Sequence, residues 1–128
     1  LVMLDIDHFK QVNDRFGHGA GDQVLIQFCQ RLSQRLRRID VLCRLGGEEF
    51  MVLCPDTDQA QAMAVANALW QALRSEPIEG VGLVSASFGV AAWAPNETAD
   101  SLLRRVDDAV YAAKNAGRDR VQAAAPAD

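Results

Sequence analysis

Two adjacent carboxylates, Glu48 and Glu49, directly follow a pair of glycines between two short apolar segments, 41–45 and 50–54. Paired glycines between such segments predict a β-hairpin, because glycine adopts positive φ angles without steric cost. Both carboxylates then lie at or beside the hairpin tip. Side chains alternate along a strand, so the two carboxylates point in different directions and can serve different functions. The alternative is an acidic turn that only faces solvent.

A second acidic pair, Asp5 and Asp7, lies where the apolar segment at the start of the chain ends. Mg²⁺ prefers oxygen ligands, usually one or two carboxylates together with substrate phosphates. Asp5, Glu48 and a backbone carbonyl between the two aspartates can supply such a set. A short helix follows, and its free N–H groups favour phosphate, with Lys10 adding a positive charge in the first turn. Asp7 itself is expected to cap this helix.

The composition is that of one soluble globular domain: 128 residues, of which 49% are hydrophobic and 23% are charged. The net charge of −4 argues against broad electrostatic binding to nucleic acid or anionic lipid. No apolar run approaches the ~20 residues of a membrane span. The three cysteines, Cys29, Cys43 and Cys54, lie in apolar stretches without CxxC spacing, which indicates reduced core thiols in a cytoplasmic protein.

The hydrophobic periodicity predicts how these residues are positioned. Strands are expected at 1–6, 41–45, 50–54, 84–90 and 120–123, and helices at 8–16, 19–38, 59–75 and 101–116. This order indicates an α+β fold of the ferredoxin or palm type, in which helices flank an antiparallel central sheet. In that topology the first strand pairs with the second strand of the hairpin, so Asp5 meets Glu48 and Glu49. The domain is expected to cover 1–123, followed by a tail at 124–128.

Six motifs in this order resemble those of the GGDEF domain, the diguanylate cyclase family. They lie at residues 5–10, 13–14, 17–22, 44–50, 87–90 and 111–118, and the resemblance covers the chain to about residue 121. The hairpin reads Gly-Gly-Glu-Glu-Phe, a variant that active members also carry. The family's opening, a helix and a Leu-Thr-Gly-Leu-like stretch before the first strand, is absent. We therefore expect an N-terminally truncated domain that is weakly active alone.

The resemblance implies that two GTP molecules condense to cyclic di-GMP and two pyrophosphates across a homodimer of domains, with Mg²⁺ or alternatively Mn²⁺. The matching positions imply Asp5, the Ile6 carbonyl and Glu48 as metal ligands; Glu48 or Glu49 as the acceptor of the hydroxyl proton; Lys10 as the transition-state stabiliser; Lys114 and Arg118 as phosphate contacts; and Asn13 and Asp22 as readers of guanine. A carboxylate suits the N1–H and N2–H₂ donors of guanine, and an amide suits its remaining groups. His18 either lines the same pocket or only packs at a helix start.

Arg37 and Asp40 match the family's RxxD inhibitory site at the expected end of the long helix. An arginine can pair with guanine O6 and N7 or stack on the ring, and a carboxylate can accept from N1–H and N2–H₂. The product is therefore expected to act as an inhibitor. The alternative is a favourable interaction of arginine with the helix macrodipole.

Three other readings have different functions. A silent receptor for GTP or cyclic di-GMP is disfavoured by the intact hairpin, and an adenine-specific cyclase or polymerase is disfavoured by Asn13 and Asp22. A purely structural domain would leave six motifs to coincidence. The resemblance places the domain in the cytoplasm, as part of a larger protein that is either soluble or membrane-anchored, with no nucleic-acid partner and no direct membrane contact.

Overall fold

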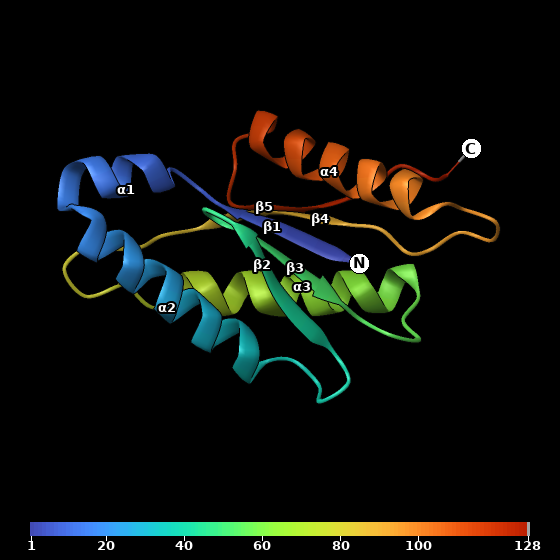
Figure 1. Ribbon diagram of the computed structural model, residues 1–128, viewed down its shortest axis with the longest axis horizontal. Helices are drawn as coiled ribbons and strands as arrows, with labels where there is room; N and C mark the ends of the chain where they lie inside the picture. Colours follow the sequence, from blue (N-terminus) through green and yellow to red (C-terminus); the bar gives the residue numbers. More distant parts are fainter. Residues whose placement is uncertain (128) are drawn as a thin grey trace.

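A five-stranded sheet with the strand order β2-β3-β1-β4-β5 forms the centre of the computed structural model, which describes residues 1–127 (Figure 1). Along the chain the elements are β1 (Val2–Ile6), α1 (Phe9–Phe16), α2 (His18–Gln34), β2 (Val41–Gly46), β3 (Glu49–Leu53), α3 (Gln59–Arg74), β4 (Ala86–Val90), α4 (Ala99–Asn115) and β5 (Arg120–Ala123). The expected α+β fold with a central sheet is confirmed.

Strand β1 lies in the middle of the sheet and pairs antiparallel with both β3 and β4. The hairpin strands β2 and β3 are also antiparallel, so the four neighbouring strands β2, β3, β1 and β4 form the expected antiparallel sheet. Strand β5 is added parallel to β4 at the edge. A parallel neighbour requires a crossover connection, and α4 supplies it.

Helices cover both faces of the sheet, with α2 and α3 on one side and α4 on the other (Figure 1). The larger core includes Phe28, Phe50 and Phe88, and a smaller core under α4 includes Met3 and Val106. Side chains alternate along β1, so Leu4 belongs to the larger core while Met3 faces α4. The same alternation directs Asp5 toward α4.

The hairpin that carries the two glutamates forms as predicted. Gly46 and Gly47 have φ angles of 150° and 51°, which favour glycine. Glu48 lies in the turn, and Glu49 is the first residue of β3. Arg44 donates to the Gly47 carbonyl from Nε and Nη2, at 3.1 and 2.9 Å, and this holds the turn closed.

Several predicted helix ends differ from the structure by one to four residues, and two of them bear on predicted residue roles. Helix α2 ends at Gln34 instead of residue 38, and Arg37 and Asp40 lie in the following turn. The Arg37 N–H donates to Asp40 Oδ2 at 2.8 Å, so the aspartate side chain competes with the helical bond. Helix α1 begins after His8, which has a φ of 57° and makes no side-chain cap. Asp7 therefore does not cap α1, contrary to the prediction.

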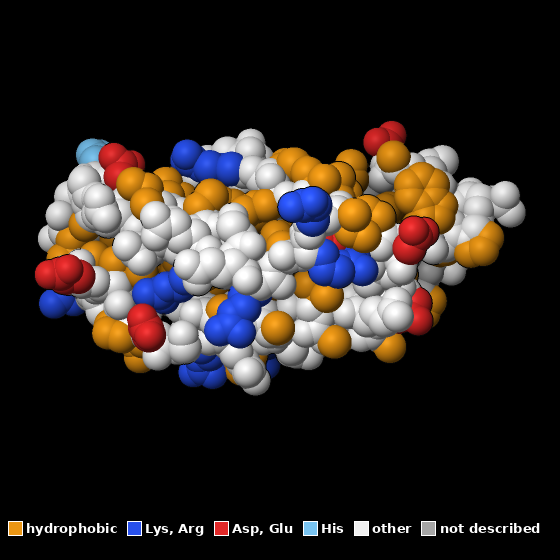
Figure 2. All heavy atoms as spheres, turned by 90° about the horizontal axis from the view of Figure 1, so that it is seen from below, with side chains coloured by type: hydrophobic (Ala, Val, Ile, Leu, Met, Phe, Trp, Pro, Cys, Tyr) orange, Lys and Arg blue, Asp and Glu red, His pale blue; other side chains and the backbone are white. Residues whose placement is uncertain are grey.

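The remaining surface features add little to the site. No helix among the described residues is long and apolar enough to cross a membrane. The three cysteines are free, as expected, but half-buried rather than fully in the core. Of the predicted tail 124–128, residue 128 lies outside the described residues, and the Ala124 N–H donates to the Val90 carbonyl at 2.8 Å. Figure 2 shows a face on which charges of both signs lie among hydrophobic side chains.

Candidate active site

The end of β1 meets the hairpin tip, which confirms the central structural prediction. Asp5 stands opposite Glu49 in the register of β1 and β3. The Ile6 N–H donates to the Glu48 carbonyl at 3.1 Å, one residue further along. Four of the predicted site residues, two on β1 and two at the hairpin, are thus joined by backbone pairing, although more than forty residues separate the two pairs in sequence.

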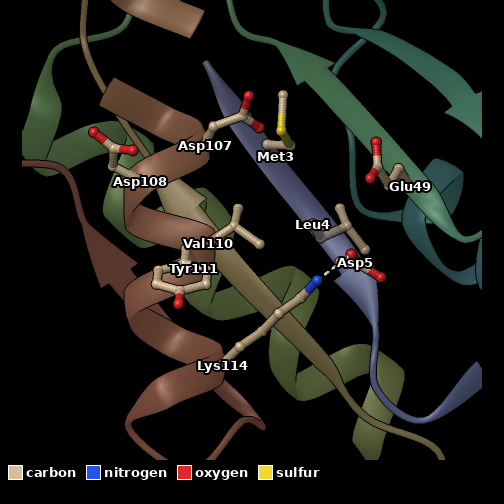
Figure 3. Close-up of a pocket in the computed structure, with 9 residues that line it drawn as sticks. All are labelled: Met3, Leu4, Asp5, Glu49, Asp107, Asp108, Val110, Tyr111 and Lys114. Atoms are coloured by element: carbon tan, nitrogen blue, oxygen red, sulfur yellow. Dashed lines mark hydrogen bonds and ion pairs between the residues drawn. The ribbon is translucent and has the colours of Figure 1, made fainter. Parts of the chain in front are cut away.

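Lys114 reaches from α4 to the carboxylate of Asp5, and the two form an ion pair (Figure 3). Asp5 is 7% exposed, so this is a largely buried charge with a cationic partner. A buried carboxylate without such a partner would be strongly destabilising. The ion pair fixes the C-terminal end of β1, which carries Asp5, against the last turn of α4.

A cavity of about 260 Å³ gathers six of the predicted site residues. Its lining includes the three predicted metal ligands and the three predicted cationic contacts: Asp5, Ile6, Glu48, Lys10, Lys114 and Arg118. Two carboxylates and a carbonyl suit a hard divalent cation, and three cations suit the oxygens of a polyphosphate. Among the described residues no group of three His, Cys, Asp or Glu forms a complete metal site. The donor set therefore fits Mg²⁺ when phosphate oxygens supply the further ligands.

A neighbouring cavity of about 330 Å³ shares Asp5 and Lys114 with the first (Figure 3). Glu49 lines this second cavity, together with Asp107, Asp108 and Tyr111, whereas Glu48 lines the first. The two adjacent glutamates are therefore divided between two cavities that meet at one ion pair. This arrangement agrees with the expectation that they point in different directions.

The predicted guanine readers lie at the corner between α1 and α2. Asn13 is half-buried, and its amide lies so close to Gly21 that a β-carbon on that glycine would be 1.8 Å from Asn13 Oδ1. Asp22 follows Gly21 directly and is exposed, as is His18 at the start of α2. Asn13, Asp22 and His18 do not line the 260 Å³ cavity, but Phe9 does, and its ring also lies against Gly21. Phe9 thus connects the charged cavity to the corner.

Asp7 is a buried residue whose partners sequence reasoning missed. Its carboxylate accepts hydrogen bonds from the Ser85 and Ser87 hydroxyls, both at 2.6 Å, and from the Asp119 N–H at 2.9 Å. These bonds use the side chain that was expected to cap α1. The alternation of serines with apolar residues before and within β4 was the available signal, since serines on a buried strand need polar partners.

The family model described as "Diguanylate cyclase, GGDEF domain" matches residues 1–120 of the chain. The chain belongs to the GGDEF family. In this GGDEF domain the hairpin glutamates, Asp5 of β1, Lys114 of α4 and Arg118 of the following loop line the two cavities.

The relatives of this GGDEF domain include named diguanylate cyclases. The chain is 42% identical over 127 residues to diguanylate cyclase DgcP of Pseudomonas aeruginosa, and this alignment covers 97% of the chain and 19% of DgcP. The active GGEEF domain of a diguanylate cyclase from Vibrio cholerae superposes with a TM-score of 0.85 at 30% identity, over 98% of this chain and 82% of that one. The GGDEF domain of DgcB from Caulobacter crescentus, solved in complex with c-di-GMP, superposes with a TM-score of 0.86 at 33% identity, over 95% of this chain and 75% of that one.

The chain spans about a fifth of DgcP, so the match concerns one domain of a longer protein. The hairpin of this GGDEF domain has the GGEEF sequence that is named in the description of the Vibrio cholerae structure.

The predicted inhibitory pair of this GGDEF domain is intact and self-paired. Arg37 Nη2 and Asp40 Oδ1 are 2.9 Å apart, and Arg37 also donates to the Pro55 carbonyl at 3.2 Å and to Thr57 Oγ1 at 3.0 Å. The Asp40 side chain is 2% exposed, whereas that of Arg37 is 50% exposed. Burial raises the pKa of Asp40, but hydrogen bonds from Arg37 outweigh it and hold the pKa below its ordinary value. Arg37 therefore presents a charged surface at the turn after α2.

Proposed function

We propose that this domain is a diguanylate cyclase that condenses two GTP molecules into cyclic di-GMP and two pyrophosphates. The observation that supports this most strongly is the single cavity lined by three cations and by the carboxylates of Asp5, Glu48 and Asp7, in a member of a family whose relatives are named diguanylate cyclases. A receptor that only binds the nucleotide would not need the second glutamate beside that cavity.

Asp5, Glu48 and the Ile6 carbonyl would hold Mg²⁺, which neutralises the phosphate oxygens as charge develops on them. Lys114, which is paired with Asp5, and Arg118 bind the phosphates in the same cavity, and Lys10 adds its charge from the first turn of α1. These residues hold one triphosphate in a fixed orientation. Most of the catalytic effect in phosphoryl transfer comes from such positioning and from charge neutralisation.

In the reaction, the 3′-hydroxyl oxygen of one GTP bonds to the α-phosphorus of the other. The bond from that phosphorus to the bridging oxygen breaks, and pyrophosphate leaves. The hydroxyl proton needs an acceptor, and we assign it to Glu49. This glutamate lines the cavity beside the metal ligands, so it can face a hydroxyl that arrives from a second nucleotide. A second such event closes the cyclic product.

Two further parts of the proposal concern recognition. Asp22 accepts from the N1–H and N2–H₂ groups of guanine, and Asn13 binds the same base from α1, with His18 at the edge of the pocket. Arg37 and Asp40 bind cyclic di-GMP away from the GTP site and slow turnover. The ion pair that they form agrees with this role, because both side chains already converge on one turn.

Each domain holds one GTP in this scheme, so two domains must meet. The test measures pyrophosphate release from GTP and Mg²⁺ as a function of protein concentration, with the chain alone and with the chain fused to a dimerising coiled coil. We expect the rate per domain to rise with concentration in the free chain and to be high and constant in the fusion. A rate per domain that is independent of concentration, in a protein that stays monomeric, would contradict the dimer mechanism.

A further inference from the structure

Asp7 is a buried carboxylate that the proposed reaction does not use. It is 5% exposed and directly follows Ile6 at the end of β1. Its Oδ1 accepts from Ser87 Oγ, and its Oδ2 accepts from both Ser85 Oγ and the Asp119 N–H. The carboxylate therefore ties the end of β1 to the segment that enters β4 and to the loop between α4 and β5.

The loop that Asp7 holds has an unfavourable backbone conformation. Gly117, Arg118 and Asp119 have successive φ angles of 120°, 64° and 47°. Positive φ angles are strained for residues other than glycine, and they persist only where the surrounding structure holds them. Arg118 lies in the middle of this run and lines the 260 Å³ cavity. The position of its guanidinium thus depends on contacts made by its neighbours.

Asp119 receives those contacts from two sides. Its N–H is bound by Asp7, while its carboxylate accepts from Trp70 Nε1 at 2.7 Å and lies 3.2 Å from Arg74 Nη2. The Arg74 guanidinium also stacks over the Trp70 ring, 4.8 Å from its centroid. Helix α3 therefore supports the loop from outside, and Asp7 fixes it from inside the site.

We propose that Asp7 is a positioning residue for phosphate binding. Through the Asp119 N–H it fixes the strained loop, and the loop holds Arg118 at a set distance from the Asp5 end of β1. This inference rests on the proposed function, because it takes the GTP triphosphate as the ligand of Arg118. It predicts that Asp7 affects binding of the phosphates and not binding of the base.

The test compares the affinities of two ligands by calorimetry at saturating Mg²⁺. One is a GTP analogue with a methylene group between the α- and β-phosphorus, which cannot release pyrophosphate, and the other is guanosine. Asp7→Ala should lower the affinity for the analogue about tenfold, which is the effect of losing one charge-assisted hydrogen bond. The affinity for guanosine should stay within about twofold of that of the wild type. Asp7→Asn should restore most of the affinity, since the amide oxygen still accepts from Asp119.

Two further variants separate positioning from other roles. The double variant Asp7→Ala with Arg118→Ala should bind the analogue as weakly as Arg118→Ala alone, because Asp7 acts through Arg118. Glu97→Gln is the matched control, since Glu97 is also a buried, hydrogen-bonded carboxylate but lies before the other end of α4. It should change neither affinity. If Asp7→Ala does not fold, Trp70→Phe applies the same test by removing one of the two contacts between Asp119 and α3, with about a threefold loss in affinity for the analogue.

Several results would overturn the inference. Equal losses for both ligands would mean general damage, and multiplicative effects in the double variant would mean that Asp7 acts independently of Arg118. Loss in both Asp7→Ala and Asp7→Asn with a raised Mg²⁺ requirement would make Asp7 a metal ligand. Failure of the unmodified chain to bind the analogue would refute the proposed function itself, whereas normal binding by Asp7→Ala would refute only the positioning role.

Discussion

Replacing Gly21 by alanine tests how the corner between α1 and α2 reads guanine. The new β-carbon would lie 1.8 Å from Asn13 Oδ1, 2.9 Å from Asn13 Cγ and 3.3 Å from Phe9 Cζ. The oxygen is the far end of a flexible side chain, so we expect the Asn13 amide to move while the backbone stays. Alanine gains about 1 kcal/mol of helix propensity, and overpacking costs about 1–3 kcal/mol. The net loss of unfolding free energy should be about 0–2 kcal/mol.

Gly21→Ala should also weaken binding of the guanine base. Displacing the amide removes one hydrogen bond to the base, worth about 0.5–1.5 kcal/mol, so guanosine and GTP should both bind roughly three- to tenfold more weakly. Gly19→Ala is the matched control on the same helix, because nothing lies within 4 Å of its β-carbon. It should raise the unfolding free energy by about 1 kcal/mol and leave both affinities unchanged.

The assays for this pair are urea unfolding, followed by tryptophan fluorescence, and calorimetry with guanosine and GTP. Unchanged guanosine affinity in Gly21→Ala would refute the role of Asn13 in base reading. Weaker binding in Gly19→Ala would show that any added methyl group on α2 has the same effect, and the reasoning from the contact distances would then be wrong.

Four other variants test separate parts of the account. Glu48→Gln should lower pyrophosphate release at least about 100-fold with an unchanged urea midpoint, because it removes the negative charge of a proposed metal ligand and keeps its shape. Asp22→Ser should narrow the difference in turnover between GTP and ATP. In the wild type, adenine offers no N1–H to the Asp22 carboxylate, which is then left unpaired at a free-energy cost of about 1–3 kcal/mol. Equal wild-type turnover of both nucleotides would refute this reading. Arg37→Ala should abolish calorimetric binding of cyclic di-GMP and straighten the progress curve, and unchanged product affinity would leave the arginine without that role. Hydrogen bonds from Arg105 lower the pKa of Glu97 from 4.5 to about 2, so the stability that this carboxylate contributes is present above pH 4.5 and is lost as the pH falls toward 2; urea midpoints of wild type and Glu97→Gln should converge over that range.

The meeting of Asp5 with the hairpin glutamates was predictable because each step depends on a strong local signal. The glycine pair predicts the turn, the apolar segments predict the strands, and the order of elements predicts which strands are neighbours. The register then follows from alternation, since a shift by one residue would exchange the β1 side chains that face the two cores and turn Asp5 toward the larger apolar core. Backbone pairing of Asp5 with Glu49 is the result.

The role of Asp7 was not predictable in the same way. Its partners Ser85, Ser87 and Asp119 lie 78, 80 and 112 residues away, whereas a helix cap needs only the next few residues. A local rule therefore favoured the cap, and long-range hydrogen bonds prevailed. The end of α2 was missed for a related reason, because the side chain of Asp40 binds the Arg37 N–H in place of a helical carbonyl.

The most direct test of the account is the identity of the product. The chain, fused to a dimerising coiled coil, is incubated with GTP and Mg²⁺, and the nucleotides are separated by chromatography and identified by mass. We predict cyclic di-GMP with two pyrophosphates released for each product molecule, and none from the Glu48→Gln fusion. Bound but unaltered GTP in the wild-type fusion would contradict the cyclase and indicate a receptor instead.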